Sequence, residues 1–326
     1  MMIININMQN ITYFKKYLNN PIGKNNRSYF QLKNKKFLPD EKFETFTRAT
    51  KDFDKNVLLK EGGKRVKGCY RRSLKNKPLI TIVTVVLNNG KDLEKTIKSV
   101  LLQKYDNIEY IIIDGGSNGS IISKIKKYDD YIDYWISQKD DGIFDAQNKG
   151  IRLAGGDFIC ILNVGDYFTE NGINHILKKM KKNKNLDIIF GAVKKKKIYS
   201  GFKEKDIDKT LNIFPSHVST FINMKIYKKY GLYDLKYKLY NDYEFIYRLI
   251  KKTKLNYDIT NKNELVTVFD LKGFSSRVSL FRKLMGEINI RKKYENLIMV
   301  FLKITIKFLR FFQVKFFEPK KFKRHN

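Results

Sequence analysis

Apolar segments of two kinds alternate between residues 79 and 193. Short runs rich in β-branched residues are typical of buried strands, and stretches with apolar residues at helical spacing are typical of amphipathic helices. The pattern predicts strands at 79–87, 108–113, 134–137, 158–162 and 187–193, and helices at 92–102, 117–127, 144–154 and 172–182. This alternation predicts an α/β fold, with a mostly parallel sheet covered by helices on both faces.

The regular pattern does not extend to either end of the chain. Residues before Pro78 are rich in Lys and Asn and show weak periodicity, which predicts an irregular extension. The pattern after 193 predicts helices at 225–229, 240–252 and 279–294, and a strand at 265–269. We therefore divide the chain into a basic extension (1–77), an α/β domain with two halves (78–193 and 194–275) and a helical basic tail (276–326).

The tail has the composition of a helix that lies in a membrane surface. Lys303, Lys307 and Arg310 recur at spacings of four and three, which places them on one face of a helix with Phe and Leu around the rest. Such a helix is typical of an interfacial anchor, and the basic run at 320–324 would add attraction to anionic lipid. The alternative is a helix packed on its own domain or on a dimer partner.

Neither a signal peptide nor a membrane span is indicated. No apolar stretch of signal-peptide length follows the first residues, and no uncharged apolar run approaches the roughly 20 residues of a membrane span. Two cysteines give no disulfide framework. We expect a cytoplasmic protein, attached peripherally to the inner face of the plasma membrane if residues 297–326 bind an anionic membrane surface.

The chain is strongly basic, with 66 Lys and Arg residues against 33 acids and a formal net charge of +33. Such a charge favours polyanionic partners: nucleotide diphosphates, anionic lipid or nucleic acid. Lys, Asn and Ile are all abundant, so an AT-rich genome can account for part of the excess. The lysines are spread along the chain and no helix-turn-helix, zinc or RNP1-like pattern appears. A basic nucleic-acid-binding protein is therefore only the alternative interpretation. Under the main interpretation we expect no nucleic-acid partner.

Two predicted strands end in an aspartate. Asp114 follows the run 111–113, and Asp166 follows the run 158–162 after a short polar turn. Ligands of parallel sheets lie outside the carboxyl ends of the strands, so both acids would face one crevice. Mg²⁺ and Mn²⁺ prefer oxygen ligands, which makes Asp166 a candidate metal ligand. Each acid could instead belong to a polar turn without a ligand.

One further segment and two further residues are candidates for binding or catalysis. The polar segment 137–150 precedes a helix and could bind a diphosphate or a sugar. Asp242 could remove a proton from an acceptor hydroxyl as a general base. His217 is the only histidine that we place in a site, although a structural hydrogen bond is an equal alternative for it.

Other nucleotide-binding classes lack their sequence signals. The chain contains neither G-x-G-x-x-G nor G-x-x-x-x-G-K-[ST], so the dinucleotide and P-loop interpretations are not supported. A nucleotidyltransferase on a similar sheet would carry a loop rich in Gly and Arg or Lys after the first strand. Residues 87–91 are too poor in both to favour that alternative.

The order of the motifs resembles that of family 2 glycosyltransferases. The segments that carry the resemblance are Thr81–Asn88, Glu94–Gln103, Glu109–Ser117, Asp140–Gly150, Leu162–Asp166 and Tyr240–Glu244. They cover roughly residues 75–275 and are most similar to bacterial colanic-acid-type enzymes that build polysaccharide repeat units. The resemblance implies a GT-A fold: a mixed, mostly parallel, Rossmann-like sheet flanked by helices, with a nucleotide half and an acceptor half.

The resemblance also implies an activity. Family members move a sugar from a nucleotide-diphosphate sugar to an acceptor hydroxyl with inversion and without a covalent enzyme intermediate. For this chain it implies a hexosyltransferase-type enzyme of cell-surface polysaccharide biosynthesis. The acceptor would be a saccharide or a lipid-linked saccharide, and the cofactor Mg²⁺ or Mn²⁺.

Site residues carry over by position. The resemblance implies a nucleotide-sugar site of Thr84, Val86, Asn88, Asp114, Asp140, Asn148 and Asn163, with Asp114 at the base or ribose. It implies metal binding by Asp166, a general base at Asp242 and an acceptor-side contact by His217.

The chain departs from the family pattern at Asn163, Gly165, Gln138 and Gln147, and Gln138 stands where close relatives often carry Glu. Asn163 and Gly165 replace the two acids of the D-x-D found in many members, which leaves Asp166. Gln147 stands where many members carry Arg, so a cationic contact to the diphosphate would come from another residue such as Lys149.

Overall fold

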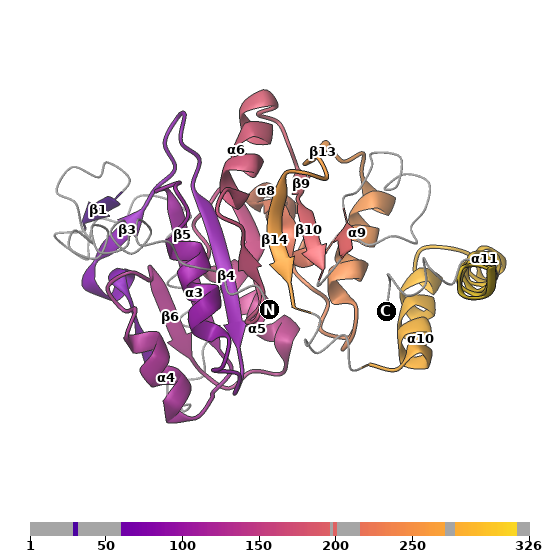
Figure 1. Cartoon of the computed structure of the whole chain (residues 1–326), viewed down its shortest axis with the longest axis horizontal. Helices are drawn as coiled ribbons and strands as arrows, with labels where there is room; N and C mark the ends of the chain where they lie inside the picture. The colour runs from indigo at the N-terminus through magenta and orange to yellow at the C-terminus, as the bar shows by residue number, and fades with distance from the viewer. Residues whose placement is uncertain (1–28, 32–59, 196–197, 201–215, 271–277, 318–326) are drawn as a thin grey trace.

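A computed structural model describes residues 29–31, 60–195, 198–200, 216–270 and 278–317 (Figure 1). The strands are β1 (Tyr29–Gln31), β2 (Lys60–Gly62), β3 (Cys69–Arg71), β4 (Ile80–Val86), β5 (Ile108–Asp114), β6 (Tyr134–Ser137), β7 (Phe158–Ile161), β8 (Tyr167–Phe168), β9 (Ile188–Phe190), β10 (Ala192–Lys195), β11 (Ile198–Ser200), β12 (Thr220–Asn223), β13 (Tyr257–Ile259) and β14 (Leu265–Phe269). The helices are α3 (Leu93–Leu101), α4 (Gly119–Lys126), α5 (Ile143–Leu153), α6 (Gly172–Lys182), α8 (Met224–Tyr230), α9 (Asn241–Lys252), α10 (Leu280–Lys292) and α11 (Leu297–Phe317), with 3₁₀ turns η1 (Lys64–Lys67) and η2 (His217–Ser219).

The main sheet has eight strands in the order β13-β9-β12-β7-β4-β5-β6-β2. Its centre is parallel, because β4 pairs in parallel with both β5 and β7, and β6 continues the parallel set. Strand β12 runs antiparallel between β7 and β9. A smaller mixed sheet, β11-β10-β14-β8, stands beside it. The predicted fold class, a mixed and mostly parallel GT-A sheet flanked by helices, is confirmed.

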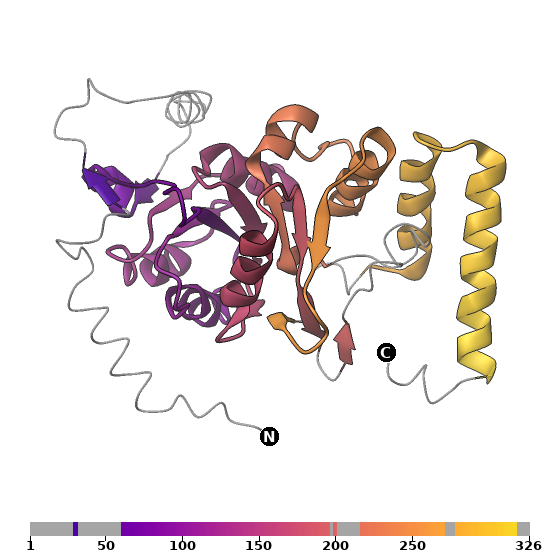
Figure 2. The same ribbon diagram turned by 90° about the horizontal axis from the view of Figure 1, so that it is seen from above.

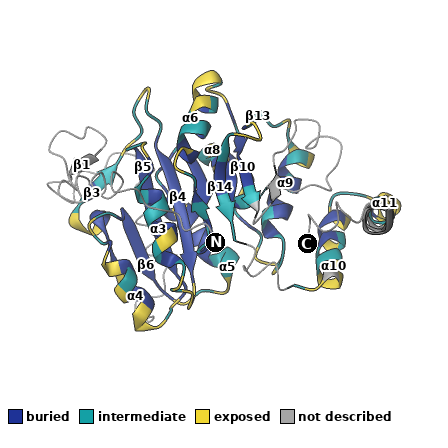
Figure 3. Ribbon diagram, in the orientation of Figure 1, coloured by how far each residue is buried: buried dark blue, intermediate teal, exposed yellow. Residues whose placement is uncertain are grey.

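Helices cover both faces of the main sheet, because its central strands are apolar on both sides. Side chains of α3, α4 and α6 form one core with one face of the sheet, and side chains of α5, α8 and α9 form a second core on the other. Figure 3 shows the central strands buried between these layers. The predicted helices and strands of the first half agree with the structure to within one or two residues, apart from one strand.

That exception is the single strand predicted at 187–193. The structure divides it at Gly191 into β9, which joins the main sheet, and β10, which joins the smaller sheet. A Cβ at this glycine would lie 2.2 Å from the Ser219 Oγ, so only glycine lets the backbone approach η2 closely here. The apolar pattern is continuous across the break and could not reveal it.

Part of the predicted irregular extension belongs to the main sheet. Strand β2 pairs antiparallel with β6 and forms the sheet's edge. In η1, Arg65 is buried, forms an ion pair with Glu109 of β5, and donates from Nη1 to the Leu153 carbonyl over 2.7 Å. The division at residue 77 stays a prediction, and residues 1–28 and 32–59 lie outside the described part of the chain.

Helix α10 lies next to α9, and α11 stands beside α10 on the side away from α9 (Figure 2). Ile290 of α10 packs against Tyr243 and Tyr247 of α9. Arg291 is fully buried between them and pairs with Glu287 over 2.9 Å. Helix α10 of the predicted tail thus packs against α9, the helix that carries Asp242. Within the described residues, no helix combines the length and the apolarity that a bilayer crossing demands.

Candidate active site

The strand order places Asp114 and the turn before Asp166 at one edge of the sheet. β5 ends in Asp114 and β7 runs into the turn, and both strands pair in parallel with β4, which lies between them. Carboxyl ends of adjacent parallel strands meet at the same edge, where α/β sheets bind ligands.

Asp114 is fully buried, with one oxygen bonded and one without a partner. Its Oδ2 accepts from the Ser117 backbone amide over 3.0 Å and from the Ser137 hydroxyl over 2.6 Å. No described residue donates to Oδ1, although this oxygen is buried. A buried acceptor without a donor is costly, so the geometry suits a ligand N–H or O–H at this place.

The three neighbouring residues that were predicted to line a nucleotide pocket differ in exposure. Thr84 and Val86 are buried, and Thr84 accepts a hydrogen bond of 3.1 Å from the Tyr110 hydroxyl. Asn88 is exposed with a φ of 52°, and its Oδ1 accepts from the Asn118 amide over 3.3 Å. Only Asn88 of the three therefore offers a polar side chain at the surface of this edge.

Asp140 lies directly against the turn after Asp114. A Cβ on Gly115 would come within 2.3 Å of the Asp140 Oδ2, so a glycine is required for this approach. Burial raises the pKa of Asp140, although a bond from the Gly142 amide opposes this shift. The structure therefore brings Asp114 and Asp140 together.

Asn148 and Lys149 of α5 have internal partners. The Asn148 amide donates to the Tyr233 carbonyl and accepts from the Tyr233 amide, each over 3.0 Å. The Lys149 ammonium donates to the Lys139 carbonyl over 2.9 Å and lies 3.3 Å from Asp145. Asn148 thus joins α5 to the loop before α9 rather than presenting its amide to the crevice.

The turn before Asp166 is fixed by α3 and by the end of β14. The Thr96 hydroxyl donates to the Asp166 carbonyl over 2.8 Å and accepts from the Gly165 amide over 3.1 Å. The Asp270 amide donates to the Asp166 Oδ1 over 2.8 Å. Burial raises the pKa of Asp166 to about 7, although the bond from the Asp270 amide and the charge of His217 oppose this shift.

Asp242 lies in the first turn of α9, and its position is set by the preceding loop. The Asn241 side chain accepts from the Asp234 amide over 3.0 Å and donates to the Asp234 carbonyl over 2.6 Å, which fixes the start of the helix. The Asp242 Oδ2 lies 3.1 Å from the His217 Nδ1. A helix N-terminus also favours a negative charge at this position.

The pair of Asp242 and His217 shifts both groups toward their charged forms. Burial acts to raise the pKa of Asp242, but the bond to His217 and its charge lower it to a net value below the usual one. Burial acts to lower the pKa of His217, but the bond to Asp242 and the charges of Asp242 and Asp166 raise it. Asp242 is therefore ionised at neutral pH, as a general base must be.

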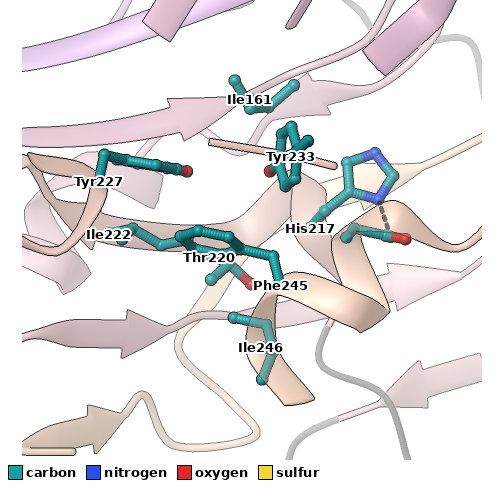
Figure 4. Close-up of a pocket in the computed structure, with 9 residues that line it drawn as sticks. Ile161, His217, Thr220, Ile222, Tyr227, Tyr233, Phe245 and Ile246 are labelled. Carbon is teal, nitrogen blue, oxygen red and sulfur yellow. Dashed lines mark ion pairs between the residues drawn. The ribbon is translucent and has the colours of Figure 1, made fainter. Parts of the chain in front are cut away.

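His217 also contacts the turn that leads to Asp166. Its Nε2 lies 2.8 Å from the Asn163 Nδ2, and the Asn163 Oδ1 accepts from the Gln147 Nε2 over 3.2 Å. A small, largely apolar cavity opens beside the pair (Figure 4). It is lined by Ile161, His217, Thr220, Ile222, Tyr227, Tyr233, Asp242, Phe245 and Ile246. Asn163 and His217 thus connect the Asp166 turn to Asp242.

The donor set fits a cation that is shared with a bound phosphate. No group of three or more His, Cys, Asp or Glu side chains that could hold a metal occurs among the described residues. The Asp166 carboxylate is buried, which makes its ionised form unfavourable, and a cation bound beside it would offset that cost. Mg²⁺ and Mn²⁺ are often held by one or two carboxylates together with substrate phosphates and water. The residues present therefore suit a metal that binds with the nucleotide.

Sequence reasoning missed Thr96, Asp270 and the pairing of Gln147 with Asn163, and it named Ser137 only as the start of the polar segment 137–150. Ser137 and Asp270 each end or follow a strand, which is the same signal that marked Asp114 and Asp166. That signal, applied evenly, would have found both. Thr96 gave none, because its contact with the turn depends on how α3 packs.

Fold and site together define a GT-A-type α/β transferase, with acids at the carboxyl edge of a mixed sheet and a carboxylate–imidazole pair beside it. The family model described as glycosyl transferase family 2 matches residues 81–273, which is more than half of the chain. The chain therefore belongs to glycosyl transferase family 2.

Curated relatives match over a shorter segment. The chain is 37% identical over 93 residues to an uncharacterized glycosyltransferase of Mycobacterium tuberculosis (strain CDC 1551 / Oshkosh), covering 28% of this chain and 36% of that protein. It is 31% identical over 116 residues to the glycosyltransferase GlyG of Streptococcus pneumoniae serotype 4, covering 35% and 38%. The match thus spans well under half of either relative.

Solved structures share the fold at low identity. Staphylococcus aureus TarS 1–349 in complex with UDP-GlcNAc aligns with a TM-score of 0.53 and 12% identity, covering 65% of each chain. A mannosyltransferase from Pyrobaculum calidifontis in complex with GDP-Man and Mn²⁺ aligns with a TM-score of 0.52 and 13% identity, covering 77% of this chain and 71% of that one.

Proposed function

We propose that this protein is an inverting, hexosyltransferase-type glycosyltransferase that moves a sugar from a nucleotide-diphosphate sugar to an acceptor hydroxyl. The observation that supports this most is the placement of Asp242 next to the Asp166 turn, through contacts of 3.1 and 2.8 Å at the two nitrogens of His217. Inverting transfer needs a base on the acceptor side and charge neutralisation on the diphosphate side. This arrangement offers one carboxylate for each.

The proposal assigns a role to each of the following site residues. Asp114 accepts from the base or ribose through its Oδ1, and Asp140 and Asn88 lie beside it at the same edge. Asp166 would hold Mg²⁺ or Mn²⁺, which when bound neutralises the charge of the departing diphosphate. Asp242 takes the proton of the acceptor hydroxyl as that oxygen attacks the anomeric carbon. Asn148 and the buried Thr84 and Val86 support the crevice from within.

The metal step predicts a pH dependence. The pKa of Asp166 is about 7 in the folded, metal-free chain, against an ordinary value of 3.8. The folded state therefore binds this proton more tightly than the unfolded state, and metal-free stability falls as pH rises between these values. A metal must displace that proton below pH 7. We expect apparent Mn²⁺ affinity in the presence of a nucleoside diphosphate to be roughly tenfold weaker at pH 6 than at pH 8.

Thermal shift measures this directly, because a ligand that binds only the folded state raises its Tm. A panel of nucleoside diphosphates and their sugars, with and without Mn²⁺, should give a larger rise at pH 8 than at pH 6. Asp166→Asn should abolish the metal-dependent part at both values. An equal Mn²⁺ effect in the wild type and in Asp166→Asn would show that another residue holds the metal.

We further propose that the acceptor is a lipid-linked saccharide of cell-surface polysaccharide synthesis, reached at an anionic membrane. The described part of α11 exposes Leu297, Ile298, Phe301, Leu302 and Leu309, each at least half exposed. Residues 297–326 contain eight Lys or Arg and one acid. An exposed apolar face on a basic helix suits an anionic lipid surface.

Not every tail cation is available to lipid. Lys303 forms an ion pair with Glu295 inside the molecule. The side chains of Lys307 and Arg310 and the whole basic run 320–324 lie outside the described residues. The lipid attraction that we propose therefore depends on the exposed apolar residues together with the remaining tail charges.

Vesicle co-sedimentation tests this proposal. Ile298→Ser with Phe301→Ser removes two side chains that are 80% and 76% exposed. Burying such a side chain is worth about 1.5–3 kcal/mol, so the double variant should lower partitioning onto phosphatidylglycerol vesicles by at least about tenfold. Val66→Ser, at a half-exposed apolar residue of η1, is the matched control. Unchanged partitioning of the double variant would remove the anchor from the proposal.

A further inference from the structure

Both ring nitrogens of His217 have a partner, and the partners come from different parts of the site. The Nδ1 lies 3.1 Å from the Asp242 Oδ2, and the Nε2 lies 2.8 Å from the Asn163 Nδ2. Asn163 in turn accepts from the Gln147 Nε2 over 3.2 Å. A single line of hydrogen bonds therefore runs from α5 through the Asp166 turn and η2 to α9.

The direction of this line follows from the carboxylate at its end. An ionised Asp242 only accepts hydrogen bonds, so the facing Nδ1 must carry a proton, because two acceptors at this distance would repel. Above the raised pKa of His217 the ring is neutral, so its Nε2 is bare, needs a donor and meets the Asn163 amide NH₂. That orientation leaves the Asn163 Oδ1 as an acceptor for the Gln147 NH₂. Every group in the line is satisfied in this direction.

The reverse direction fails at Asp242. A proton on Nε2 alone would turn the amides of Asn163 and Gln147 round, and the two amides can still pair in that orientation. The bare Nδ1 would then face the Asp242 carboxylate over 3.1 Å with no proton between them, and two acceptors at this distance repel.

We infer that His217 is a positioning residue for Asp242, in the tautomer that carries its proton on Nδ1 and accepts from Asn163 at Nε2. This inference rests on the proposed function, in which Asp242 is the general base. The Nδ1–H fixes the Asp242 Oδ2, and the Tyr243 amide donates to the Oδ1 over 3.0 Å, so the carboxylate has one orientation. Because the Asp166 amide donates to the Asn163 carbonyl over 3.1 Å, the same line sets Asp242 relative to the Asp166 turn.

Two substitutions separate positioning from simple filling of space. The amide of His217→Asn reaches about as far as Nδ1 and can still donate to Asp242, whereas the amide of His217→Gln reaches toward the Nε2 position. We expect His217→Asn to keep most of the kcat. His217→Gln should lose about 10²-fold in kcat, the size of effect that a small misplacement of a reacting group produces, with little change in donor KM.

If both variants lost kcat equally while keeping the wild-type Tm, the Nδ1 donor would not matter and the inference would be wrong. If both kept full kcat, Asp242 would not depend on His217 and the inference would also be wrong. Transfer measured with each variant at equal folded concentration distinguishes these results.

A spectroscopic test does not depend on activity. The chain has three histidines, His175, His217 and His325, so ¹⁵N–¹H long-range NMR of the labelled full chain can assign His217 by its loss in His217→Asn. At pH 9 we expect a protonated Nδ1 and an unprotonated Nε2. Asn163→Asp places a carboxylate against Nε2 and should leave both nitrogens protonated at a pH where the wild-type ring is neutral.

An Nε2–H tautomer in the wild type, or a ring unaffected by Asn163→Asp, would overturn the inference. These outcomes are distinct from a failure of the proposed function. If the Nδ1–H tautomer is found but Asp242→Asn transfers sugar at the wild-type rate, the geometry stands and the role of Asp242 as base fails.

Discussion

Asp242→Asn is expected to lower the kcat for sugar transfer by about 10²- to 10⁴-fold, the usual contribution of a general base. The amide has the shape of the carboxylate but cannot take the acceptor's proton. Donor binding should change little, because the Asn163–His217 contact separates Asp242 from the Asp166 turn, where we propose that the diphosphate binds. Steady-state transfer and donor Kd, measured on the same preparation, separate the two effects.

Asp130→Asn is a suitable control for the loss of one negative charge. Its side chain is 68% exposed and pairs only with the exposed Lys67 among the ion pairs of the described residues. Transfer by this variant should match the wild type. If Asp242→Asn retained full activity while Asp166→Asn lost it, the base would have to be a different group.

The second large effect concerns stability. Arg65→Met should lower the free energy of unfolding by about 3–5 kcal/mol, since it leaves the buried Glu109 without its cationic partner. The two side chains are 5% and 2% exposed. Glu109 also accepts from the Thr81 hydroxyl over 2.6 Å and from the Gly155 amide over 2.7 Å, so its charge is held inside the domain. Urea unfolding at pH 7 gives the difference.

The double variant Arg65→Met with Glu109→Gln shows where that effect comes from. Removing the second charge should recover part of the lost stability, because the main cost is the unpaired carboxylate rather than the missing contact. A loss below about 1 kcal/mol in the single variant, as for exposed pairs, would mean that η1 does not pack on the sheet in solution.

The sequence allowed the layers of the domain to be predicted because its strands and helices have strong, separate periods. The run Ile80–Val86 is β-branched throughout and mostly apolar on both faces, which suits a central strand. Two features escaped this reasoning. The break at Gly191 interrupts no apolar pattern, and the pairing of Lys60–Gly62 with Tyr134–Ser137 joins distant segments whose register no local signal specifies.

The site could be predicted in part for the same reason. Asp114 ends an apolar strand and Asp166 lies in the turn after another, so the sheet topology alone places both at one edge. Asn148 was expected at the sugar, but its amide is bonded to the backbone of Tyr233, a contact across a large sequence separation that spacing cannot reveal. The hydrogen bond between Asn163 and His217 joins residues 54 positions apart, so it likewise could not be predicted from the sequence.

The most direct measurement is the anomeric configuration of the sugar when a nucleotide sugar is cleaved by the purified full chain. ¹H NMR can follow an α-linked donor with Mn²⁺ at pH 8, with acceptor present or with water in its place. We expect cleavage that requires the metal, depends on Asp242 and Asp166, and gives the β-configured sugar first. Initial formation of the α-configured sugar, or no cleavage and no binding of any donor in the panel, would contradict inverting sugar transfer at this site.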